Sequence, residues 1–180
     1  KDYDKLFGQG KVDFPKVRAA MDEIGYRPDL MLMETNLYDQ NWVDAAGPAA
    51  DGVYVRTVFW PFEEAADNPA TQQYIDVVNA VDGKVALLGA QSMSSWLLFA
   101  QAARDCDLDG DLTRTCVLDG AASVTEWTGG GLHAPTNPAE NRGPDCTLVL
   151  QVQDGAFVRH APTDGDYDCD PAYVVQLDAD

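Results

Sequence analysis

Two short apolar runs constrain the fold of this chain more than any other feature of its sequence. Leu30-Met31-Leu32-Met33 is apolar at every position, which is typical of a strand buried on both faces of a parallel sheet. Val53 to Phe59 is β-branched and aromatic, and a short helix is expected between the two runs, from Gln40 to Ala46. Strand, helix and strand in that order predict a βαβ unit, so the expected fold class is α/β.

Caps and helical spacing predict three more helices. The first begins at Asp13-Phe14-Pro15 and ends at Gly25, because Pro is tolerated in a first turn and Gly ends helices. The second begins at Asn68-Pro69 and ends at Gly83, and the third runs from Val85 to Arg104. Their predicted buried positions are Val17, Met21 and Ile24, then Tyr74, Val77, Val78 and Val81, then Leu88, Trp96, Phe99 and Ala103.

The last third of the sequence has a different character. Residues 120–145 are rich in Gly, Pro, Asn and Thr and are expected to form a long loop. Cys146 to Gln151 is a predicted strand, Asp154-Gly155 is a strong hairpin signal, and Phe157-Val158-Arg159 is the return strand. A final strand is expected over Ala172 to Leu177.

The charge excludes some classes of partner. The chain has 180 residues with 12 Lys and Arg against 30 Asp and Glu, a net charge of −18. This charge repels phosphate, so neither nucleic acid nor an anionic membrane surface is an expected partner. No apolar run reaches the ~18 residues of a membrane helix. The chain opens with polar Lys1-Asp2-Tyr3-Asp4, so we expect either a cytosolic protein or one whose beginning has been removed.

Four cysteines bear on that choice. Cys106 and Cys116 are close in sequence, and Cys146 and Cys169 flank the predicted hairpin. Four cysteines allow three pairings, of which we favour Cys106–Cys116 and Cys146–Cys169, because each closes a short local loop. Disulfides would place the protein outside the cytoplasm, whereas the alternative is four buried thiols in a cytosolic protein. Without a CxxC motif, and with 2 His in the chain, a zinc site is poorly supported.

Other chemistries are weak. The acidic stretches 107–111 and 164–170 alternate as calcium ligands can, but they lack the Gly and Glu positions of an EF-hand loop, so we expect solvated loops and no metal. Ser92 is not in a G-x-S-x-G motif, and a Ser–His hydrolase using His133 is disfavoured. Gly129-Gly130-Gly131 lacks the residues of a phosphate-binding loop. We therefore predict no catalytic residue and no cofactor.

Glu34 is the most informative acidic residue. It lies just past the carboxyl end of a predicted parallel strand, where ligands of open α/β sheets bind. A carboxylate there can accept strong hydrogen bonds from a ligand ammonium group, although an exposed loop glutamate is the alternative. Tyr38, Phe59 and Trp60 are expected near the same edge, either as walls of a ligand site or as core aromatic residues.

An ordered set of segments runs through the chain: Met21-Asp22-Glu23-Ile24-Gly25-Tyr26, Ala50-Asp51-Gly52-Val53-Tyr54-Val55, Asn68-Pro69, Leu88-Gly89-Ala90-Gln91 and Trp127-Thr128-Gly129-Gly130-Gly131-Leu132-His133. In this order the segments resemble the carboxyl-terminal half of a type I periplasmic solute-binding protein. The resemblance covers roughly residues 16–160 and is nearest to the leucine/isoleucine/valine-type receptors of ABC transporters, in versions typical of actinobacteria.

The resemblance implies two Rossmann-like α/β lobes joined by hinge crossovers that close on a ligand. Residues 1–60 would be a βαβ portion of the second lobe, residues 61–125 a crossover with first-lobe helices, and residues 126–180 a return loop with terminal strands of the second lobe. In such receptors an acid of the second lobe holds the ligand's ammonium group, and Glu34 matches it by position. Gln91, at the start of the long helix, is a further candidate, so the implied ligand-binding residues are Glu34, Tyr38, Trp60 and Gln91.

The length departs from the family, whose receptors are about twice as long. The amino-terminal lobe is missing, so we expect an incomplete portion of the fold, with helices 69–104 lacking the sheet that they would cover. An export signal and any lipid anchor would lie upstream of Lys1.

The implied function is extracytoplasmic delivery of a small ligand, an amino acid or related metabolite, to an ABC permease by hinge closure. The alternatives are a sensory ligand-binding domain of the same fold and, with less support, a hydrolase or metal-dependent enzyme.

Overall fold

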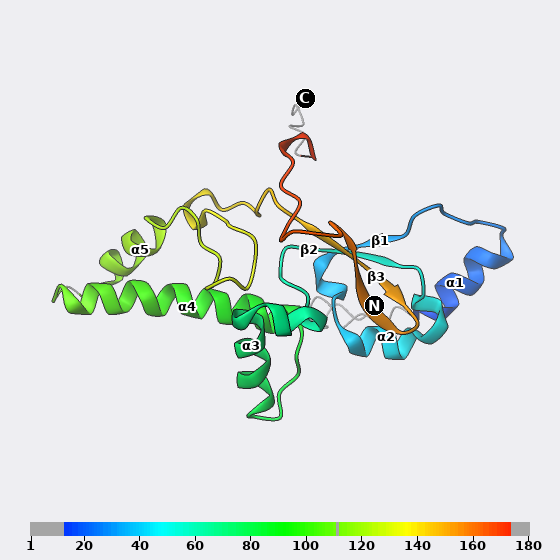
Figure 1. The fold of residues 1–180 in the computed structure, drawn as a ribbon, viewed down its shortest axis with the longest axis horizontal. Coiled ribbons are helices and arrows are strands. Elements are labelled where there is room, and N and C mark those ends of the chain that lie inside the picture. The colour runs from blue at the N-terminus through cyan, green and yellow to red at the C-terminus, as the bar shows by residue number, and fades with distance from the viewer. Residues whose placement is uncertain (1–12, 111, 174–180) are drawn as a thin grey trace, which may run out of the picture.

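The computed structural model describes residues 13–110 and 112–173, and they form an elongated molecule (Figure 1). A small sheet with the helices α1 (Phe14–Glu23) and α2 (Gln40–Ala46) occupies one end. The long helix α4 (Leu87–Leu108) extends to the other end, with α5 (Arg114–Ala122) beside it. The helix α3 (Pro69–Asn79) projects from the middle, so the sheet and the later helices form two distinct parts.

The sheet contains the predicted βαβ unit. Its strands β1 (Leu32–Met33), β2 (Tyr54–Thr57), β3 (Leu148–Gln153) and β4 (Ala156–Ala161) are arranged in the order β1-β2-β3-β4. β1 and β2 are parallel and are joined through α2, which confirms the α/β prediction. β3 and β4 are antiparallel neighbours, so residues from the end of the chain complete a sheet that the first strands begin.

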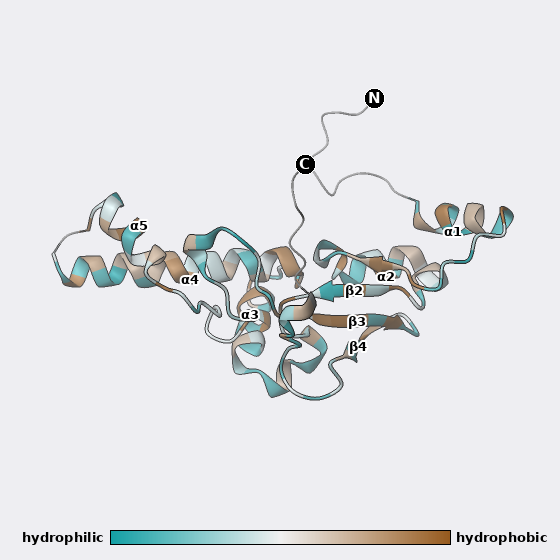
Figure 2. Ribbon diagram, turned by 90° about the horizontal axis from the view of Figure 1, so that it is seen from above, coloured by the Kyte–Doolittle hydropathy of each residue, from teal (hydrophilic) through white to brown (hydrophobic). Residues whose placement is uncertain are grey.

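The core lies on one face of this sheet. Side chains alternate along β2 and β3, so that every second residue is buried while its neighbours are half exposed. β3 is among the most hydrophobic elements in Figure 2. The buried face packs with residues from α1, α2 and the segment after them, and the cluster includes Phe14, Val43, Ala46, Ala50, Val53, Val55, Leu150, Val152 and Phe157.

The prediction that residues 30–33 are buried on both faces is wrong for the described chain. Leu30 and Leu32 are 57% and 51% exposed, although Met33 is partly buried. β1 lies at the edge of the sheet and pairs only with β2 among the described strands. An apolar run therefore identified a strand correctly, but a second covering layer and a further neighbouring strand are not present in the described residues.

The predicted core positions of the long helix are also wrong. Leu88, Trp96 and Phe99 are 63%, 67% and 49% exposed, and Ala103 is partly buried. The buried face carries smaller residues as well as one leucine: Leu87, Ala90, Ser94, Ala102 and Cys106. Because α4 has apolar side chains on several faces, spacing did not select the face that meets the rest of the described chain. The expectation from the resemblance, that helices over 69–104 have uncovered apolar stripes, agrees with this exposure.

The helix starts were predicted better than the helix faces. Asp13 caps α1 by accepting a hydrogen bond from the backbone N of Lys16, and Asn68 caps α3 by accepting one from Thr71. However, Phe14 is the buried residue of α1, whereas Val17 and Ile24 are exposed. In α3 the predicted Tyr74 is buried and Val78 is partly buried, but Val77 is exposed, as is Val81 just after the helix.

The sequence did not reveal α5, whose first residues lie between the acidic stretch and the predicted loop. Thr113 caps it by accepting a hydrogen bond from Cys116 N. The predicted hairpin is present, with Asp154 and Gly155 both at positive φ, 51° and 80°. The expected final strand is not found where it can be checked, because Pro171–Tyr173 form a 3₁₀ turn and residues 174–177 lie outside the described residues.

Both predicted disulfides are present, Cys106–Cys116 and Cys146–Cys169. The first ties the end of α4 to α5. The second ties the start of the hairpin to the segment that follows β4, which returns along the sheet edge through a bridge between Thr147 and Asp168. Each disulfide therefore fixes a segment that has few buried apolar residues of its own.

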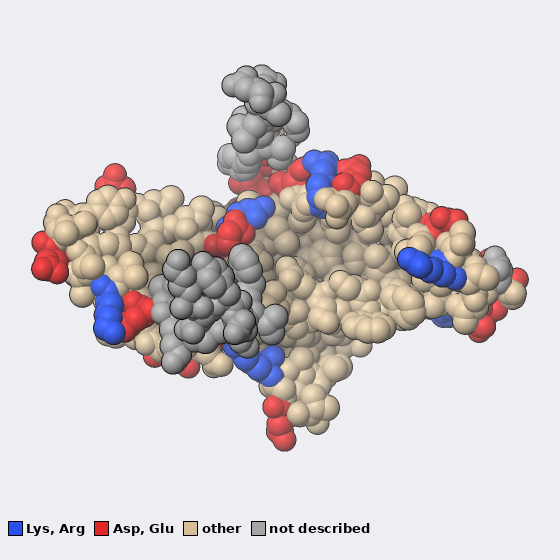
Figure 3. Space-filling view, turned by 180° about the vertical axis from the view of Figure 1, so that it is seen from behind, with Lys and Arg blue, Asp and Glu red and all other residues tan. Residues whose placement is uncertain are grey.

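The charged side chains are unevenly distributed. Seen from behind, Asp and Glu side chains cluster mainly toward the rim, and a broad area without charged side chains lies between them (Figure 3). Among the described residues, none of the helices is both long and apolar enough to cross a bilayer.

Candidate functional site

Two chain segments cross side by side at the edge where the parallel strands end. Residues 58–60 leave β2 toward the helices, and residues 132–134 return from them. Ala134 N donates to Val58 O at 2.8 Å, Trp60 N donates to Leu132 O at 2.9 Å, and Phe59 and His133 form an antiparallel bridge. This double crossing connects the sheet with the helical part of the molecule.

Glu34 follows β1 at this edge of the sheet. Its side chain is 71% exposed, with Arg56 Nη1 at 3.8 Å and the backbone N of Thr35 donating to it at 3.4 Å. Thr35 Oγ1 donates to Arg56 O at 2.7 Å, which fixes the turn after β1 against β2. The carboxylate is thus placed at the strand ends with most of its surface free to accept hydrogen bonds.

Tyr38 lies beneath this edge instead of lining it. The residue is 2% exposed, and its ring stacks on Phe62 with centroids 4.7 Å apart. Its hydroxyl accepts a hydrogen bond from Phe62 N at 2.6 Å and donates to the carboxylate of Glu63. Burial, followed by the nearby charge of Glu63, raises the pKa of Tyr38 well above its usual range, and burial also raises the pKa of Glu63. Tyr38 therefore supports the edge from below.

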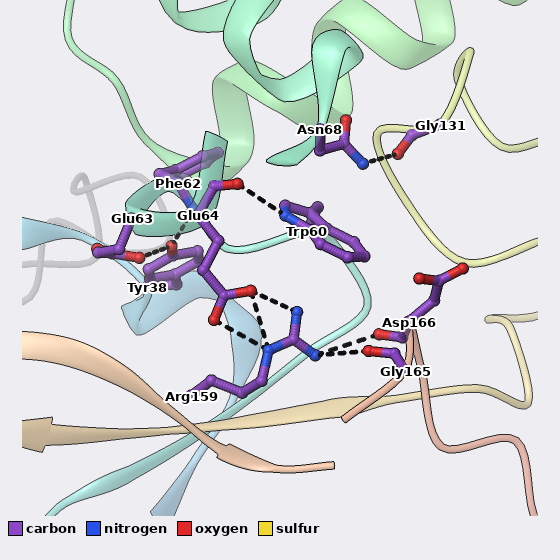
Figure 4. Close-up of polar contacts among 10 residues, drawn as sticks. All are labelled: Tyr38, Trp60, Phe62, Glu63, Glu64, Asn68, Gly131, Arg159, Gly165 and Asp166. Carbon is purple, nitrogen blue, oxygen red and sulfur yellow. Dashed lines mark hydrogen bonds and ion pairs between the residues drawn. The ribbon is translucent and has the colours of Figure 1, made fainter. Parts of the chain in front are cut away.

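Trp60 is held from several sides (Figure 4). Its indole Nε1 donates to Glu64 O at 3.1 Å, and the guanidinium carbon of Arg159 lies 4.9 Å from its ring centroid. Tyr167 approaches the ring edge with centroids 6.2 Å apart. The half-buried Trp60 ring is therefore fixed at the point where the chain leaves the sheet.

Arg159 and Glu64 form a bidentate ion pair that the sequence analysis missed. Arg159 Nε and Nη2 donate to the Glu64 carboxylate at 2.6–3.0 Å, and Nη1 donates to the carbonyl oxygens of Asp166 at 3.3 Å and Gly165 at 3.5 Å. The two residues lie 95 positions apart, so no local spacing links them. The only sequence signal was that Arg159 lies in a short predicted strand.

Gln91 lies on a different element from the other three candidates. It is exposed in the second turn of α4 and lines a cavity of about 590 Å³. The cavity is bounded by α4, the outgoing crossing and the returning loop, with Phe59, Trp127 and His133 in its wall. The structure brings Tyr38 and Trp60 to the segment 62–64, puts Glu34 beside Arg56, and gives Gln91 a cavity on the α4 side of the crossing.

Ser94 and His133 form a buried polar pair next to that cavity. Ser94 Oγ lies 2.7 Å from His133 Nε2, Trp127 Nε1 donates to Ser94 Oγ at 2.9 Å, and His133 Nδ1 lies 2.8 Å from Ala134 O. A proton on Nδ1 satisfies the carbonyl and leaves Nε2 to accept from the serine, and burial lowers the pKa of His133, which favours this neutral form.

The pair does not have the arrangement of a hydrolase. The serine that faces His133 is Ser94, not the Ser92 weighed in the sequence, and its oxygen is occupied by the indole of Trp127. A backbone carbonyl stands where an acid orients the histidine of a catalytic triad. The contacts instead join the returning segment 127–133 to α4.

Within the described parts of the chain, no group of three or more His, Cys, Asp or Glu side chains could hold a metal ion. The sulfur atoms of all four cysteines are bonded in the two disulfides.

The mixed sheet with two adjacent crossings into a separate helical part matches a portion of the type I periplasmic-binding-protein fold. A sequence model described as periplasmic binding protein matches residues 5–156, and the chain belongs to this family. The family consists of binding proteins and not of enzymes.

Solved structures of such proteins share the fold. A leucine binding protein from Thermotoga maritima has a TM-score of 0.62 and 15% identity, with 82% of this chain and 41% of that chain covered. A branched-chain amino acid ABC transporter protein from Thermus thermophilus with bound valine has a TM-score of 0.63 and 16% identity, with 81% of this chain and 41% of that chain covered. A putative branched-chain amino acid ABC transporter protein from Rhodospirillum rubrum has a TM-score of 0.56 and 20% identity, with 79% of this chain and 40% of that chain covered.

The chain therefore spans about two fifths of the length of these proteins. No curated protein sequence matches the chain significantly.

Proposed function

We propose that this chain is the carboxyl-terminal part of an extracytoplasmic solute-binding protein that delivers a small ligand to an ABC importer. The ligand is an amino acid or a related metabolite bearing an ammonium group. The observation that carries the proposal is the exposed carboxylate of Glu34 at the carboxyl ends of the parallel strands, on the sheet side of the double crossing. The fold shared with a protein that has bound valine supports the same ligand class.

In this proposal the ligand bridges two lobes, and the closed form is what the permease recognises. Glu34 accepts hydrogen bonds from the ligand ammonium group, Trp60 and Gln91 contact the ligand from the two sides of the crossing, and Tyr38 supports this edge. The reaction is binding and release, without a catalytic residue or cofactor.

The amino-terminal lobe is the proposed cover for the exposed face of α4. Residues 1–60 and 126–180 belong to the second lobe, and residues 61–125 carry the crossover and helices of the first. The exposure of Leu88, Trp96 and Phe99 supports this division, because one helix with three large apolar residues in water needs a covering surface. The disulfides support an extracytoplasmic location, and a lipid anchor upstream of Lys1 is part of the same proposal.

Ligand-induced thermal shifts test the proposal, using the longest natural polypeptide that contains these residues. A panel of amino acids and small organic acids is added to the wild-type protein, to Glu34→Gln and to Glu23→Gln, a control at an exposed position on α1. A ligand at ~100 times its Kd stabilises the wild-type protein by about 2.7 kcal/mol, a shift of several degrees. We expect the shift to disappear in Glu34→Gln and to persist in Glu23→Gln.

Absence of a shift with every compound would overturn the amino-acid proposal, and a shift that Glu34→Gln leaves unchanged would move the site away from this edge. Transport is tested separately by uptake of the labelled ligand into cells that lack the protein. Uptake lost with the protein supports delivery to a permease, whereas binding without any effect on uptake points to sensing.

A further inference from the structure

We propose that Arg159 is a positioning residue for this site. Its guanidinium, together with Glu64, fixes the ring of Trp60 at the double crossing and thereby determines how slowly a bound ligand dissociates. We call Arg159, Glu64 and Trp60 the Arg159 clamp. The inference rests on the proposed function, because it assigns Trp60 a contact with the ligand.

The geometry of the clamp requires an arginine. The planar guanidinium donates through Nε and Nη2 to one carboxylate and at the same time lies over an indole ring, 4.9 Å from its centroid (Figure 4). A lysine ammonium group has the same charge but cannot form two parallel hydrogen bonds or stack as a plane. Arg159 thus links the position of the Trp60 ring to the position of the Glu64 carboxylate.

The clamp is largely shielded from water. The side chain of Arg159 is 11% exposed and that of Glu64 is 29% exposed. In each of the other ion pairs among the described residues, at least one side chain is half exposed or more, whereas loss of one partner here leaves a poorly hydrated charge. Glu64 has a second role, because its backbone oxygen accepts the indole N–H of Trp60. The ring is therefore held through both its face and its nitrogen.

The clamp also joins two parts of the chain that are distant in sequence. Trp60 lies on the outgoing crossing and Glu64 just after it, whereas Arg159 lies on β4 and donates to Gly165 and Asp166 on the segment that follows β4. The disulfide between Cys146 and Cys169 anchors that last segment to the start of the hairpin. When the two lobes close, the sheet-side end of the crossing is therefore already rigid, and Trp60 loses little conformational freedom on binding.

Ligand dissociation rates measured by stopped flow, and fluorine NMR of 5-fluorotryptophan-labelled protein, test this inference. The ligand is the amino acid that gives the largest thermal shift with the wild-type protein. The variants are Arg159→Lys, Glu64→Gln and the double variant, with Arg18→Lys as a matched control at a partly exposed position on α1. The Trp60 resonance is identified by its loss in Trp60→Phe.

We expect Arg159→Lys to move or broaden the Trp60 resonance and to raise the dissociation rate about tenfold, with the association rate unchanged within about twofold. Glu64→Gln should also raise the dissociation rate. The rate of the double variant should not exceed that of the faster-dissociating single variant, because both residues serve one contact. Arg18→Lys should match the wild-type protein in both measurements.

A wild-type dissociation rate in Arg159→Lys overturns the inference, as does a raised rate with an unmoved Trp60 resonance. Additive effects in the double variant also overturn it. Absence of any binding by the wild-type protein overturns the proposed function and this inference together, so the two failures are distinguishable. If Arg159→Lys does not fold, Glu64→Gln carries the same measurements, because its amide still fits the space of the carboxylate.

Discussion

Ser94 Oγ and His133 Nε2 lie 2.7 Å apart, although 39 residues separate them in the sequence. Ser94 is on the long helix and His133 is on the segment that returns to the sheet, so their hydrogen bond joins the two parts of the molecule close to the crossing. Trp127 adds a third member by donating its indole N–H to the serine. Three predictions test this connection, and a fourth tests the disulfide between Cys106 and Cys116.

Replacement of Ser94 by Ala should destabilise the protein by about 1–3 kcal/mol, because a buried His133 Nε2 and the Trp127 Nε1–H lose their common partner. Urea unfolding measures the difference. Ser95→Ala is the control, since Ser95 is exposed and donates only to the backbone of its own helix, to Gln91 O. Equal stability of the two variants would contradict a role for the Ser94 contact.

The free energy of unfolding should fall as the pH drops below about 6.5, in part because of His133. Burial lowers the pKa of His133 from its ordinary value of 6.5, so the unfolded chain takes up this proton at a higher pH than the folded chain. The loss begins as the pH falls through 6.5 and is complete below the folded pKa. Urea unfolding from about pH 7.5 to about pH 5 should show a smaller fall in His133→Gln than in the wild-type protein.

The second histidine provides the control for that pH series. His160 is exposed on β4, and His160→Gln is the matched control because it removes a histidine that is not buried. Carboxylate groups also contribute to acid unfolding, but they are the same in both variants. Identical slopes for His133→Gln and His160→Gln would show that His133 does not contribute.

Gly129→Ala should destabilise the folded protein more than Gly130→Ala does. Both glycines have positive φ, 64° and 76°, so each substitution costs about 1–2 kcal/mol from the backbone. A Cβ at Gly129 would also lie 2.9 Å from Ser94 Oγ and 3.1 Å from His133 Nε2, whereas at Gly130 nothing lies within 4 Å. The additional loss of stability in Gly129→Ala, measured by thermal unfolding, reports on the Ser94–His133 pair. Equal losses of stability in the two variants would contradict this packing.

Removal of the Cys106–Cys116 bridge by a double Ala substitution should destabilise the protein by roughly 3 kcal/mol, the value for closing a loop of this size in the unfolded chain. Urea unfolding measures the change, and a reducing agent should have a smaller additional effect on the variant than on the wild-type protein. Mass spectrometry of peptides from the unreduced protein checks the pairing itself. Peptides that join Cys106 to Cys146 or Cys169 would contradict the pairing.

Local patterns predicted the elements well because the forces that create them act over a few residues. Asp13 and Asn68 identified helix starts since a capping side chain bonds to a backbone N–H in the next turn. Asp154-Gly155 identified the hairpin because both residues tolerate positive φ. The short helix α5 was missed, because its composition is ambiguous and its cap, Thr113, is a weak local signal.

The candidate site was harder to predict because its members are distant in sequence. Glu34 could be placed from the order of strand and turn, and whether it binds a ligand stays a prediction. Tyr38 and Trp60 could be placed near the same edge, but not their roles, since burial of Tyr38 and the clamp on Trp60 depend on Phe62, Glu64 and Arg159. No sequence spacing connects Glu64 with Arg159.

The sequence by itself determined the α/β class and the strand–helix–strand order and favoured the two disulfides, since each depends on neighbouring residues or short loops. Only the tertiary structure decided which face of α4 is buried, which serine meets His133 and which acid pairs with Arg159. An apolar or charged side chain specifies that it needs a partner, but the partner is selected when distant segments pack together. The exposed Trp96 and Phe99 illustrate this: their helix was predictable, and their surroundings were not.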